Sequence, residues 1–453
     1  MKKRYTHLKK LFSSKTSKIG VIGLGYVGLP LSVEMVKKGF TVYGIDIDMK
    51  KVCALRNGKS HIKDVSDHDL QACLSSGRFF PTFDYSSLQW LDAICICVPT
   101  PLSDNQDPDT SHITHAVNQL KPYMDNGFLI TLESTTYPGT TEELIESEFA
   151  KQGLQAGVNY YLCYSPERVD PSNRHYQTGN TPKVIGGTTA QCLELGALLY
   201  GQIVERTVKV SSPKVAEMCK LLENTFRSVN IAFINEMAMM SEKMGIDIWE
   251  VIEAASTKPF GFMPFQPGPG IGGHCIPLDP MYLSWKAKGF KFYSKFIEIA
   301  QSVNQTMPEH VVSKTAQILN IHAKSLRRSR VLLLGMAYKS GVDDLRESPG
   351  LRVYELFKES GAQVDYYDPY AKSFKDKDDQ LVESIVYDLR TMSNYDCFVV
   401  ITNHQSIAYE QLAELGVAIF DTRNAFRDFD FPHIYKLGNS ITKASNYHLE
   451  AAF

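Results

Sequence analysis

The sequence predicts an α/β protein in which two Rossmann-like domains are joined by a central helical domain with one long helix. Near both ends of the chain, short apolar runs alternate with segments of helical length, a pattern typical of βαβ units around a parallel sheet. Between them, no proline or glycine occurs from residue 214 to residue 244. This uninterrupted stretch, which opens with Pro213 and stops at Gly245, predicts a single long helix.

These changes of pattern divide the chain into four segments. Residues 1–17 form a basic N-terminal tail that we expect to be solvated, residues 18–207 the first α/β domain, residues 208–325 the helical domain, and residues 326–453 the second α/β domain. The long helix exceeds most globular helices in length, which indicates a spine between domains or part of a homodimer core. A second helical pattern surrounds Pro308, which predicts a kink or a break there.

The composition argues against several classes of function. The formal net charge is −2 and 43% of residues are hydrophobic, which is typical of a globular protein and argues against nucleic acid as a partner. The sequence has no apolar run long enough for a signal peptide or a membrane span. The nine cysteines are widely spaced without a CxxC pair. We therefore expect reduced thiols in a cytoplasmic protein, and neither a disulfide framework nor a metal site.

A glycine-rich loop opens the first α/β domain. Gly23, Gly25 and Gly28 form a G-x-G-x-x-G pattern between a predicted strand and a predicted helix, whose N-terminus can bind a pyrophosphate. Asp46 follows at the end of the next strand, where its carboxylate can accept hydrogen bonds from ribose hydroxyls and repel a 2′-phosphate. The pattern predicts NAD as the cofactor. A glycine loop that only turns a corner is the less favoured interpretation.

Other residues near this loop are candidate cofactor contacts. Tyr26 and Val27 lie inside the loop itself. Lys51 follows the second predicted strand and can approach the pyrophosphate, although an exposed helix lysine would give the same pattern. Thr100 and Thr135 each follow a predicted strand, at the sheet edge where open parallel sheets bind ligands. They are candidates for contacts with cofactor or water, and each taken singly also fits an ordinary turn.

The stretch PGPGIGGHCIPLDP, residues 267–280, places the thiol of Cys275 in a rigid loop before a predicted helix. A cysteine nucleophile needs access and nearby groups that stabilise negative charge, and such a loop can supply both. One alternative is a small buried residue in a tight loop. Another is a metal site formed with His274, for which the sequence has no second ligand pair nearby.

Two further pairs of residues have side chains suited to catalysis. Lys220 and Asn224 lie four residues apart on one face of the long helix, where a cation and an amide can hold an oxyanion and a substrate hydroxyl. A solvated helix stripe is the alternative. In the turn YSPERVDP, Glu167 is a candidate general base beside Arg168, and a surface ion pair is the alternative.

Taken together, these motifs resemble those of the UDP-glucose/GDP-mannose dehydrogenase family of nucleotide-sugar 6-dehydrogenases. The resemblance covers nearly the whole chain from Lys18 onward. It consists, in order, of VIGLGYVGLPL, CVPTPL, ESTTYPGT, YSPERV, AEMCKLLENTFRSVNIAFINE, PGPGIGGHCIPLDP, GMAYKSGVDDLRESP and YDP.

The resemblance implies an NAD-dependent, four-electron oxidation of a sugar C6 alcohol to a carboxylate, without release of the aldehyde. It implies that Cys275 forms a thiohemiacetal and then a thioester, while Lys220 stabilises oxyanions. It further implies that Asp279 and Thr135 position water and that Glu167 is the acid/base for hydrolysis. The second α/β domain is the implied site for a UDP-sugar. The implied substrate contacts are Glu167, Arg168, Lys220, Asn224, Gly272, Gly273, Lys339 and Arg346.

The stretches around the cysteine loop bear on the substrate. UDP-glucose members of the family tend to have Gly-Ser-Cys in this loop, whereas this chain has GGHC after KPFGFMPFQPGPG. The set PFGFMPF, GGHCIPLDP and YLSWKAK most resembles bacterial UDP-N-acetylglucosamine 6-dehydrogenases of surface-polysaccharide pathways. UDP-glucose, UDP-N-acetylgalactosamine and UDP-N-acetylmannosamine stay as alternatives. More remote alternatives are a two-electron hydroxyacid-type dehydrogenase, which needs no thiol, and a non-catalytic NAD-binding module.

Overall fold

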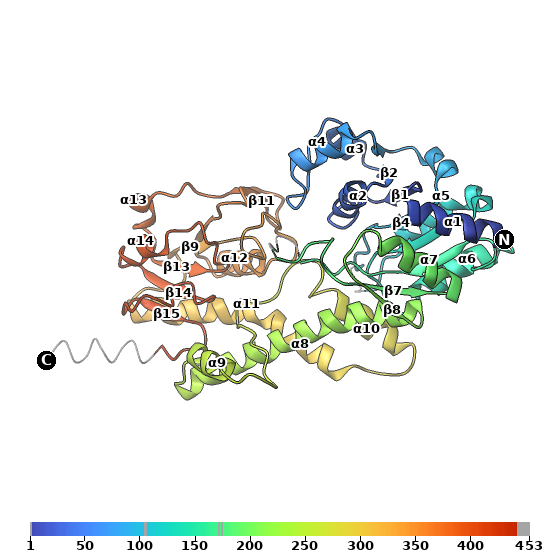
Figure 1. Cartoon of the computed structure of the whole chain (residues 1–453). Helices are drawn as coiled ribbons and strands as arrows, with labels where there is room; N and C mark the ends of the chain where they lie inside the picture. The colour runs from blue at the N-terminus through green and yellow to red at the C-terminus, as the bar shows by residue number, and fades with distance from the viewer. Residues whose placement is uncertain (1, 104–106, 171–172, 174, 442–453) are drawn as a thin grey trace. The chain divides into compact units, whose positions relative to one another are not determined.

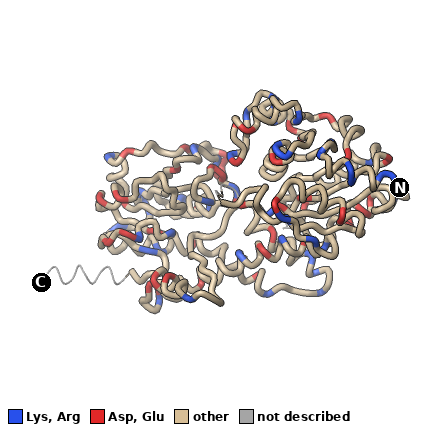
Figure 2. The backbone as a smooth tube through the Cα atoms, in the orientation of Figure 1, with Lys and Arg blue, Asp and Glu red and all other residues tan. Residues whose placement is uncertain are grey.

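The computed structural model describes residues 2–103, 107–170, 173 and 175–441. The chain forms two compact units, one made of Met1–Glu223 with Met281–Lys291 and the other of Asn224–Pro280 with Phe292–Phe453. Figure 2 shows basic and acidic residues interspersed along both units, as expected from a net charge of −2. Among the described helices, none is long and apolar enough to cross a membrane.

The first unit is built on a mostly parallel sheet (Figure 1), which has eight strands within the described residues. The chain moves outward from β1 to β3 and then returns to the other side of β1, so the strand order reverses between β1 and β4. In such sheets ligands bind beyond the carboxyl ends of the strands at this reversal. In sheet order, the strands are β3 (Phe79–Thr82), β2 (Thr41–Ile45), β1 (Lys18–Ile22), β4 (Ala93–Ile96), β5 (Leu129–Leu132), β6 (Tyr161–Tyr164), β7 (Lys183–Gly187) and β8 (Thr207–Val210).

Helices cover this sheet and bury its apolar strands. Every residue of β4 and β5 is buried, which explains why these strands read as unbroken apolar runs and not as alternating ones. The α-helices are α1 (Lys2–Ser14), α2 (Gly28–Lys37), α3 (Met49–Arg56), α4 (Asp67–Ser75), α5 (Ser111–Leu120), α6 (Ser147–Ala150) and α7 (Ala190–Tyr200), with two 3-10 helices, η1 (Tyr85–Trp90) and η2 (Lys121–Asn126), and one π-helix, η3 (Thr141–Glu146).

The second unit contains a smaller sheet, five-stranded and parallel in the part of the chain that the structure describes. Its strand order again reverses next to the first strand, as in a doubly wound fold. In sheet order, the strands are β10 (Gln363–Tyr367), β9 (Arg330–Leu334), β13 (Cys397–Val400), β14 (Ala418–Asp421) and β15 (Ile434–Lys436), and a hairpin joins β11 (Ser373–Lys375) to β12 (Leu381–Glu383).

The remaining helices include the long helix that the sequence predicts. Helix α8 (Pro213–Met244) has 32 residues, and Gly245, at φ +71°, follows its end. Helix α11 (Lys295–Ile321) continues through Pro308, so the proline does not break it. The others are α9 (Ile248–Ser256), α10 (Asp279–Lys288), α12 (Pro349–Glu359), α13 (Leu389–Met392) and α14 (Tyr409–Ala413). The predicted architecture of two α/β parts and a helical part with one long helix is confirmed.

The expectation that residues 1–17 are a solvated tail is wrong. Most of this segment is helix α1, and its Leu8 and Phe12 are fully buried in the core of the first unit. The two side chains are four residues apart and therefore lie on one helix face. Basic residues at the rim pair with the same unit: Arg4 lies 3.2 Å from Asp92 and Lys9 lies 2.5 Å from Glu194. The many basic residues of this segment obscured the apolar spacing of an amphipathic helix.

We predict that Phe12→Ala destabilises the first unit, because it removes a fully buried aromatic ring. The expected loss is about 3 kcal/mol in the free energy of unfolding, measured by denaturant titration with tryptophan fluorescence and circular dichroism. His7→Ala, at an exposed position of the same helix, is the control and should change stability by less than about 0.5 kcal/mol. Equal stability of the two variants would contradict the docking of α1.

Candidate active site

The three glycines of the first loop have different surroundings. Gly23 has φ +92°, and a Cβ there would lie 2.5 Å from the carbonyl oxygen of Cys97. A Cβ on Gly28 would lie 1.8 Å from the carbonyl oxygen of Gly23, so only glycine lets α2 begin this close to β1. A Cβ on Gly25 would meet no protein atom within 4 Å. Gly23 and Gly28 are thus required by the fold, while Gly25 leaves its backbone open to a pyrophosphate.

Asp46 holds this loop and keeps acceptor capacity. Its Oδ2 accepts a hydrogen bond from the backbone N–H of Leu24 at 2.9 Å, and its Oδ1 accepts one from Asp48 at 2.9 Å. A carboxylate offers about four lone-pair positions, so these bonds leave room for the two ribose hydroxyls. The loop and the carboxylate together fit an NAD molecule.

The other predicted cofactor contacts differ in their surroundings. Tyr26 is 38% exposed at the loop, and Val27 is half-buried at the start of α2. The Lys51 ammonium lies 4.0 Å from the Asp48 carboxylate on an exposed side of α3. This arrangement also fits the alternative of an ordinary helix lysine. Contact between Lys51 and the cofactor stays a prediction.

Thr100 and Thr135 lie together beyond the carboxyl ends of β4 and β5. The Thr100 hydroxyl donates a hydrogen bond to the backbone carbonyl of Thr135 at 2.6 Å. The carbonyl of Thr100 in turn accepts a hydrogen bond from the hydroxyl of Tyr282 on α10. The two threonine loops are therefore tied to one another, next to the reversal in strand order where Gly23 lies.

Glu167 and Arg168 do not form an ion pair with each other. The Arg168 guanidinium makes two hydrogen bonds to Glu223 of α8, at 2.6 and 3.2 Å. The Oε1 atom of Glu167 accepts the backbone N–H groups of Arg168 and Val169 at 2.7 and 2.9 Å. Its Oε2 atom lies 3.6 Å from the Lys183 ammonium. The Glu167 carboxylate is therefore oriented from both sides.

Lys183 is a site residue that sequence reasoning missed. Its side chain is 3% exposed and lies 2.6 Å from Glu133, which is fully buried, as well as near Glu167. Burial alone would lower the pKa of Lys183, but the charges of Glu133 and Glu167 outweigh burial and raise that pKa. The lysine stays charged between two carboxylates. The sequence signal for this pair was weak, because Lys183 begins β7 while Glu133 follows β5, 50 residues earlier in the chain.

Cys275 differs from the buried cysteines of this chain. Burial raises the pKa of Cys95 to about 12 and that of Cys97 well above its ordinary value. Cys275 is only half-buried, and its sulfur lies 4.0 Å from Nε2 of His274. Its carbonyl accepts the N–H of Asp279, the first residue of α10, at 2.9 Å. Cys275 is thus only partly buried and lies four residues before the start of α10, which fits the access that a nucleophile requires.

Close backbone packing builds the loop around Cys275. A Cβ on Gly272 would lie 2.7 Å from Cβ of Tyr338, and a Cβ on Gly273 would lie 2.9 Å from the Tyr338 ring. The N–H of Gly273 also donates to the carbonyl of Arg346 at 3.0 Å. The family resemblance implies that both glycines contact the substrate. The structure adds that they let the cysteine loop pack against the segment with Lys339 and Arg346.

The predicted site residues fall into two groups. In the first unit are the cofactor loop, Asp46, Thr100, Thr135, Glu167 and Lys220, of which Lys220 is half-buried on α8. In the second unit Asn224 donates a hydrogen bond from its amide to the Asp279 carboxylate. The Arg346 guanidinium pairs there with Asp344 at 2.6 Å. No group of three or more histidine, cysteine or carboxylate residues in the described part of the chain could hold a metal ion.

Comparison with known proteins now identifies the family. Three models of the UDP-glucose/GDP-mannose dehydrogenase family match: the NAD binding domain over residues 17–204, the central domain over 214–306 and the UDP binding domain over 332–428. The UDP-N-acetyl-D-mannosamine dehydrogenase of Pyrococcus horikoshii is 34% identical over 417 residues, which cover 91% of this chain and 96% of that protein. The chain belongs to this family.

Other relatives extend the comparison. The UDP-N-acetyl-D-glucosamine 6-dehydrogenase of Pseudomonas aeruginosa is 35% identical over 411 residues, covering 89% of this chain and 95% of that protein. The solved structure of the Pyrococcus horikoshii UDP-D-ManNAc dehydrogenase has a TM-score of 0.85 at 32% identity, and the match covers 94% of this chain and all of that one. The resemblance to the family, the NAD-binding domain and the enzyme class are thereby confirmed. The protein is an NAD-dependent UDP-sugar dehydrogenase.

We predict that two matched substitutions in the cofactor loop affect different properties, one the affinity for NAD⁺ and the other the stability of the fold. Gly25→Ala should raise the Kd for NAD⁺ about tenfold, because its Cβ keeps the pyrophosphate away, and should leave the unfolding midpoint unchanged. Gly28→Ala should lower the midpoint, because its Cβ would clash with the carbonyl of Gly23. Calorimetric titration with NAD⁺ and thermal unfolding measure the two effects. Unchanged NAD⁺ affinity in Gly25→Ala would contradict the assigned pyrophosphate position.

Proposed function

We propose that this enzyme oxidises the C6 hydroxyl of a UDP-N-acetylhexosamine to a carboxylate by two hydride transfers, with Cys275 as the covalent carrier between them. The observation that carries the proposal is the cysteine loop. Its half-buried thiol lies in a loop packed against the segment that bears Lys339 and Arg346. That segment belongs to the part of the chain matched by the UDP binding domain model. A two-electron dehydrogenase has no use for such a thiol.

The chemistry proceeds in four steps. The C6 hydroxyl loses a proton and C6 loses a hydride, which leaves an aldehyde. The Cys275 thiolate adds to the aldehyde carbon, and the oxygen takes up a proton to give a thiohemiacetal; loss of that proton and of a second hydride then gives a thioester. Water then adds to the thioester, and the C–S bond breaks to release the carboxylate and restore the thiol. NAD⁺ bound at the glycine loop supplies the hydride acceptor for each oxidation.

The thioester intermediate explains why the mechanism needs a thiol. The carbonyl stays activated and tethered to the protein between the two oxidations, so the reactive aldehyde does not diffuse away. Lys220 stabilises negative charge on the C6 oxygen through its ammonium group. Glu167 takes a proton from the attacking water. Thr135 and Asp279 hold that water, and Asn224 binds the substrate while its amide also contacts Asp279.

Lys183 acts as a positioning residue for Glu167, the proposed general base. It is buried between Glu133 and Glu167 and carries a positive charge. With two backbone N–H groups on the other oxygen, this charge keeps the Glu167 carboxylate in one orientation. A general base needs such fixed geometry, because proton transfer requires a hydrogen-bonded approach to the water.

The stretches PFGFMPF, GGHCIPLDP and YLSWKAK favour UDP-N-acetylglucosamine as the substrate. UDP-N-acetylmannosamine is the second candidate, because relatives named for it include one at 34% identity over 91% of this chain. The Pseudomonas aeruginosa relative, named for UDP-N-acetylglucosamine, is 35% identical. Both candidates have an acetamido group at C2, which separates them from UDP-glucose.

We also propose that the enzyme is a homodimer or a larger homo-oligomer formed through α8. A row of exposed apolar side chains, the α8 stripe, recurs at intervals of three, four or seven residues and so follows one helix face. Exposed fractions are 58% for Leu222 and 55% for Phe233, which is unusual for large apolar residues on a single face. The α8 stripe consists of Val215, Met218, Leu222, Phe226, Phe233, Met240 and Met244. A second copy of the same helix is an apolar partner of matching length.

We predict that the purified enzyme forms two NADH per UDP-N-acetylglucosamine consumed and little NADH with UDP-glucose. The measurement is a panel of UDP-N-acetylglucosamine, UDP-N-acetylmannosamine, UDP-N-acetylgalactosamine and UDP-glucose, with NADH followed by absorbance and the sugar acid by mass spectrometry. A preference for UDP-N-acetylmannosamine would select the second candidate. A preference for UDP-glucose would refute the proposed substrate class.

In the same assay, Cys275→Ser should lower formation of the sugar acid roughly a thousandfold or more, because no thioester can form. Cys53→Ser is the matched control, since Cys53 is an exposed thiol of the first unit, and it should keep two NADH per sugar. An unchanged rate of sugar-acid formation by the Cys275→Ser variant would contradict the thioester mechanism.

We predict that Phe233→Glu shifts the enzyme to a smaller assembly, because a carboxylate in an apolar contact is costly to desolvate. Light scattering coupled to size-exclusion chromatography reports the mass. Val386→Glu is the control, since it places the same charge at an apolar residue that is 81% exposed outside the α8 stripe. A monomeric wild-type enzyme, or a Phe233→Glu variant of unchanged mass, would argue against assembly through α8.

A further inference from the structure

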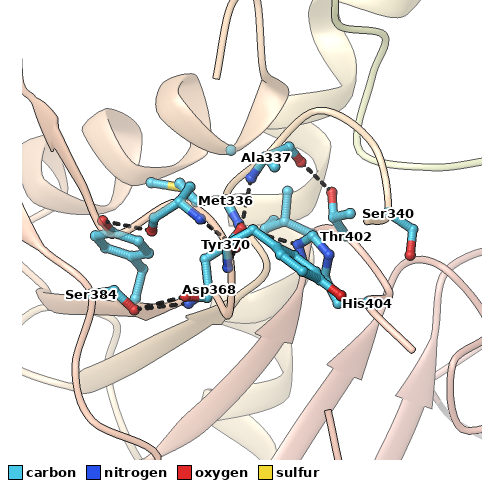
Figure 3. A network of polar contacts seen from close by, with 12 residues as sticks. Met336, Ala337, Ser340, Asp368, Tyr370, Ser384, Thr402 and His404 are labelled. Carbon is cyan, nitrogen blue, oxygen red and sulfur yellow. Dashed lines mark hydrogen bonds and ion pairs between the residues drawn. The ribbon is translucent and has the colours of Figure 1, made fainter. Parts of the chain in front are cut away.

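The loop that carries Lys339 is anchored by a buried polar network in the second unit (Figure 3). This loop, residues 335–341, follows β9 and is here called the Lys339 loop. It begins at Gly335, whose φ of +80° and close approach to the carbonyl of Thr402 exclude a side chain. The network joins it to Asp368, just after β10, and to residues 402–404, just after β13. All three segments lie at the carboxyl ends of neighbouring strands.

Asp368 occupies the position that Asp46 occupies in the first unit, directly after the second strand of its sheet. Its Oδ2 accepts the N–H groups of Met336 and Ala337 at 2.7 and 2.9 Å. Its Oδ1 accepts those of Tyr370 and Ala371 at 2.8 and 2.9 Å.

A further donor, Nε2 of His404, lies 3.0 Å from Oδ2 of Asp368, and both side chains are fully buried. Burial alone would raise the pKa of Asp368, but the hydrogen bonds from His404 and from backbone N–H groups outweigh burial and lower that pKa to about 2. The carboxylate is thus occupied by protein donors. Unlike Asp46, it has no lone pair to give to a ribose.

The hydrogen bonds of His404 fix its tautomer. Its Nδ1 accepts the backbone N–H of Gly341 at 3.2 Å, so Nδ1 carries no proton. Its Nε2 then carries the proton that it donates to Asp368. The imidazole therefore bridges Asp368 and the far end of the Lys339 loop, and its two nitrogens have different tasks. The ring is also packed beside Tyr370, with 5.1 Å between ring centres.

Two more hydrogen bonds join the Lys339 loop to the segment around His404. The Thr402 hydroxyl donates to the carbonyl of Ala337 at 2.6 Å, and the Ser340 hydroxyl donates to the carbonyl of Asn403 at 2.9 Å. Contacts with residues 402–404 therefore precede and follow Lys339 in sequence. A lysine in a loop held on both sides loses less conformational freedom when it binds a ligand.

We propose that His404 is a positioning residue for the UDP-sugar, because its Nδ1 fixes Gly341 and thereby the backbone on which Lys339 is mounted. The inference rests on the proposed function in one respect, the contact between Lys339 and the nucleotide sugar. Asp368 keeps four backbone donors when the imidazole is lost. Gly341 loses its acceptor. The bond to Gly341 should therefore matter more for ligand affinity than the bond to Asp368.

Two amide substitutions separate these bonds. The Oδ1 of asparagine can take the place of histidine Nδ1 and still accept from Gly341, whereas the Nε2 of glutamine can take the place of histidine Nε2 and still donate to Asp368. His404→Gln should raise the Kd for UDP about tenfold, and His404→Asn should stay within about threefold of the wild type. Calorimetric titration of the full-length enzyme with UDP measures both. Steady-state kinetics should show a higher KM for the UDP-sugar with kcat within about twofold.

Further variants keep the outcomes distinct. Ser340→Ala removes a bond to the same loop without emptying the core and should raise the Kd for UDP about threefold. Lys339→Ala should weaken UDP binding more than His404→Gln or Ser340→Ala does. If Lys339→Ala weakens UDP binding while His404→Gln and His404→Asn behave alike, the positioning role is overturned and the proposed function stands. If Lys339→Ala leaves UDP affinity unchanged, the contact of Lys339 with substrate fails, and the inference fails with it.

Discussion

The cysteine loop keeps its shape because several of its positions have no side chain. At Gly268 a Cβ would meet the Arg423 guanidinium at 2.4 Å, and at Gly272 and Gly273 it would meet Tyr338 at 2.7 and 2.9 Å. Backbone packing of this kind tolerates almost no movement. The thiol of Cys275 is therefore positioned by the same contacts that position the segment with Lys339 and Arg346. The proposed nucleophile and the proposed nucleotide contacts therefore belong to one compact unit.

The two Rossmann-like parts share one arrangement of a glycine loop and a carboxylate, but the carboxylate is used differently in each. Each has a left-handed glycine after its first strand, Gly23 or Gly335, and a carboxylate after its second strand that accepts backbone N–H groups of the glycine loop. Asp46 makes few such bonds and keeps capacity for a ribose. Asp368 is saturated by His404 and by four backbone N–H groups, two of them from the Lys339 loop. The number of protein donors on one carboxylate thus separates a dinucleotide site from a different kind of site on a similar sheet.

The sequence alone predicted the structural features that show as a regular pattern or that involve residues close together along the chain. Alternation of apolar runs predicted both sheets, and the absence of proline and glycine after Pro213 predicted α8. Charge misled the interpretation of α1, because its basic residues obscured the spacing of Leu8 and Phe12. Lys183 was missed because its partners, Glu133 and Glu167, are distant in sequence and only the strand order brings them together. His404 was missed for the same reason, since Gly341 lies 63 residues away.

Asp46 has a consequence for any change of coenzyme. The carboxylate that is predicted to discriminate against a 2′-phosphate also holds the glycine loop, because its oxygens accept the N–H groups of Leu24 and Asp48. A neutral or basic residue there would admit the phosphate but release the turn that aligns the pyrophosphate. Adaptation toward NADP therefore requires at least two coordinated substitutions, one to bind the phosphate and one to re-anchor the loop. Coenzyme choice in this chain is protected by a folding requirement.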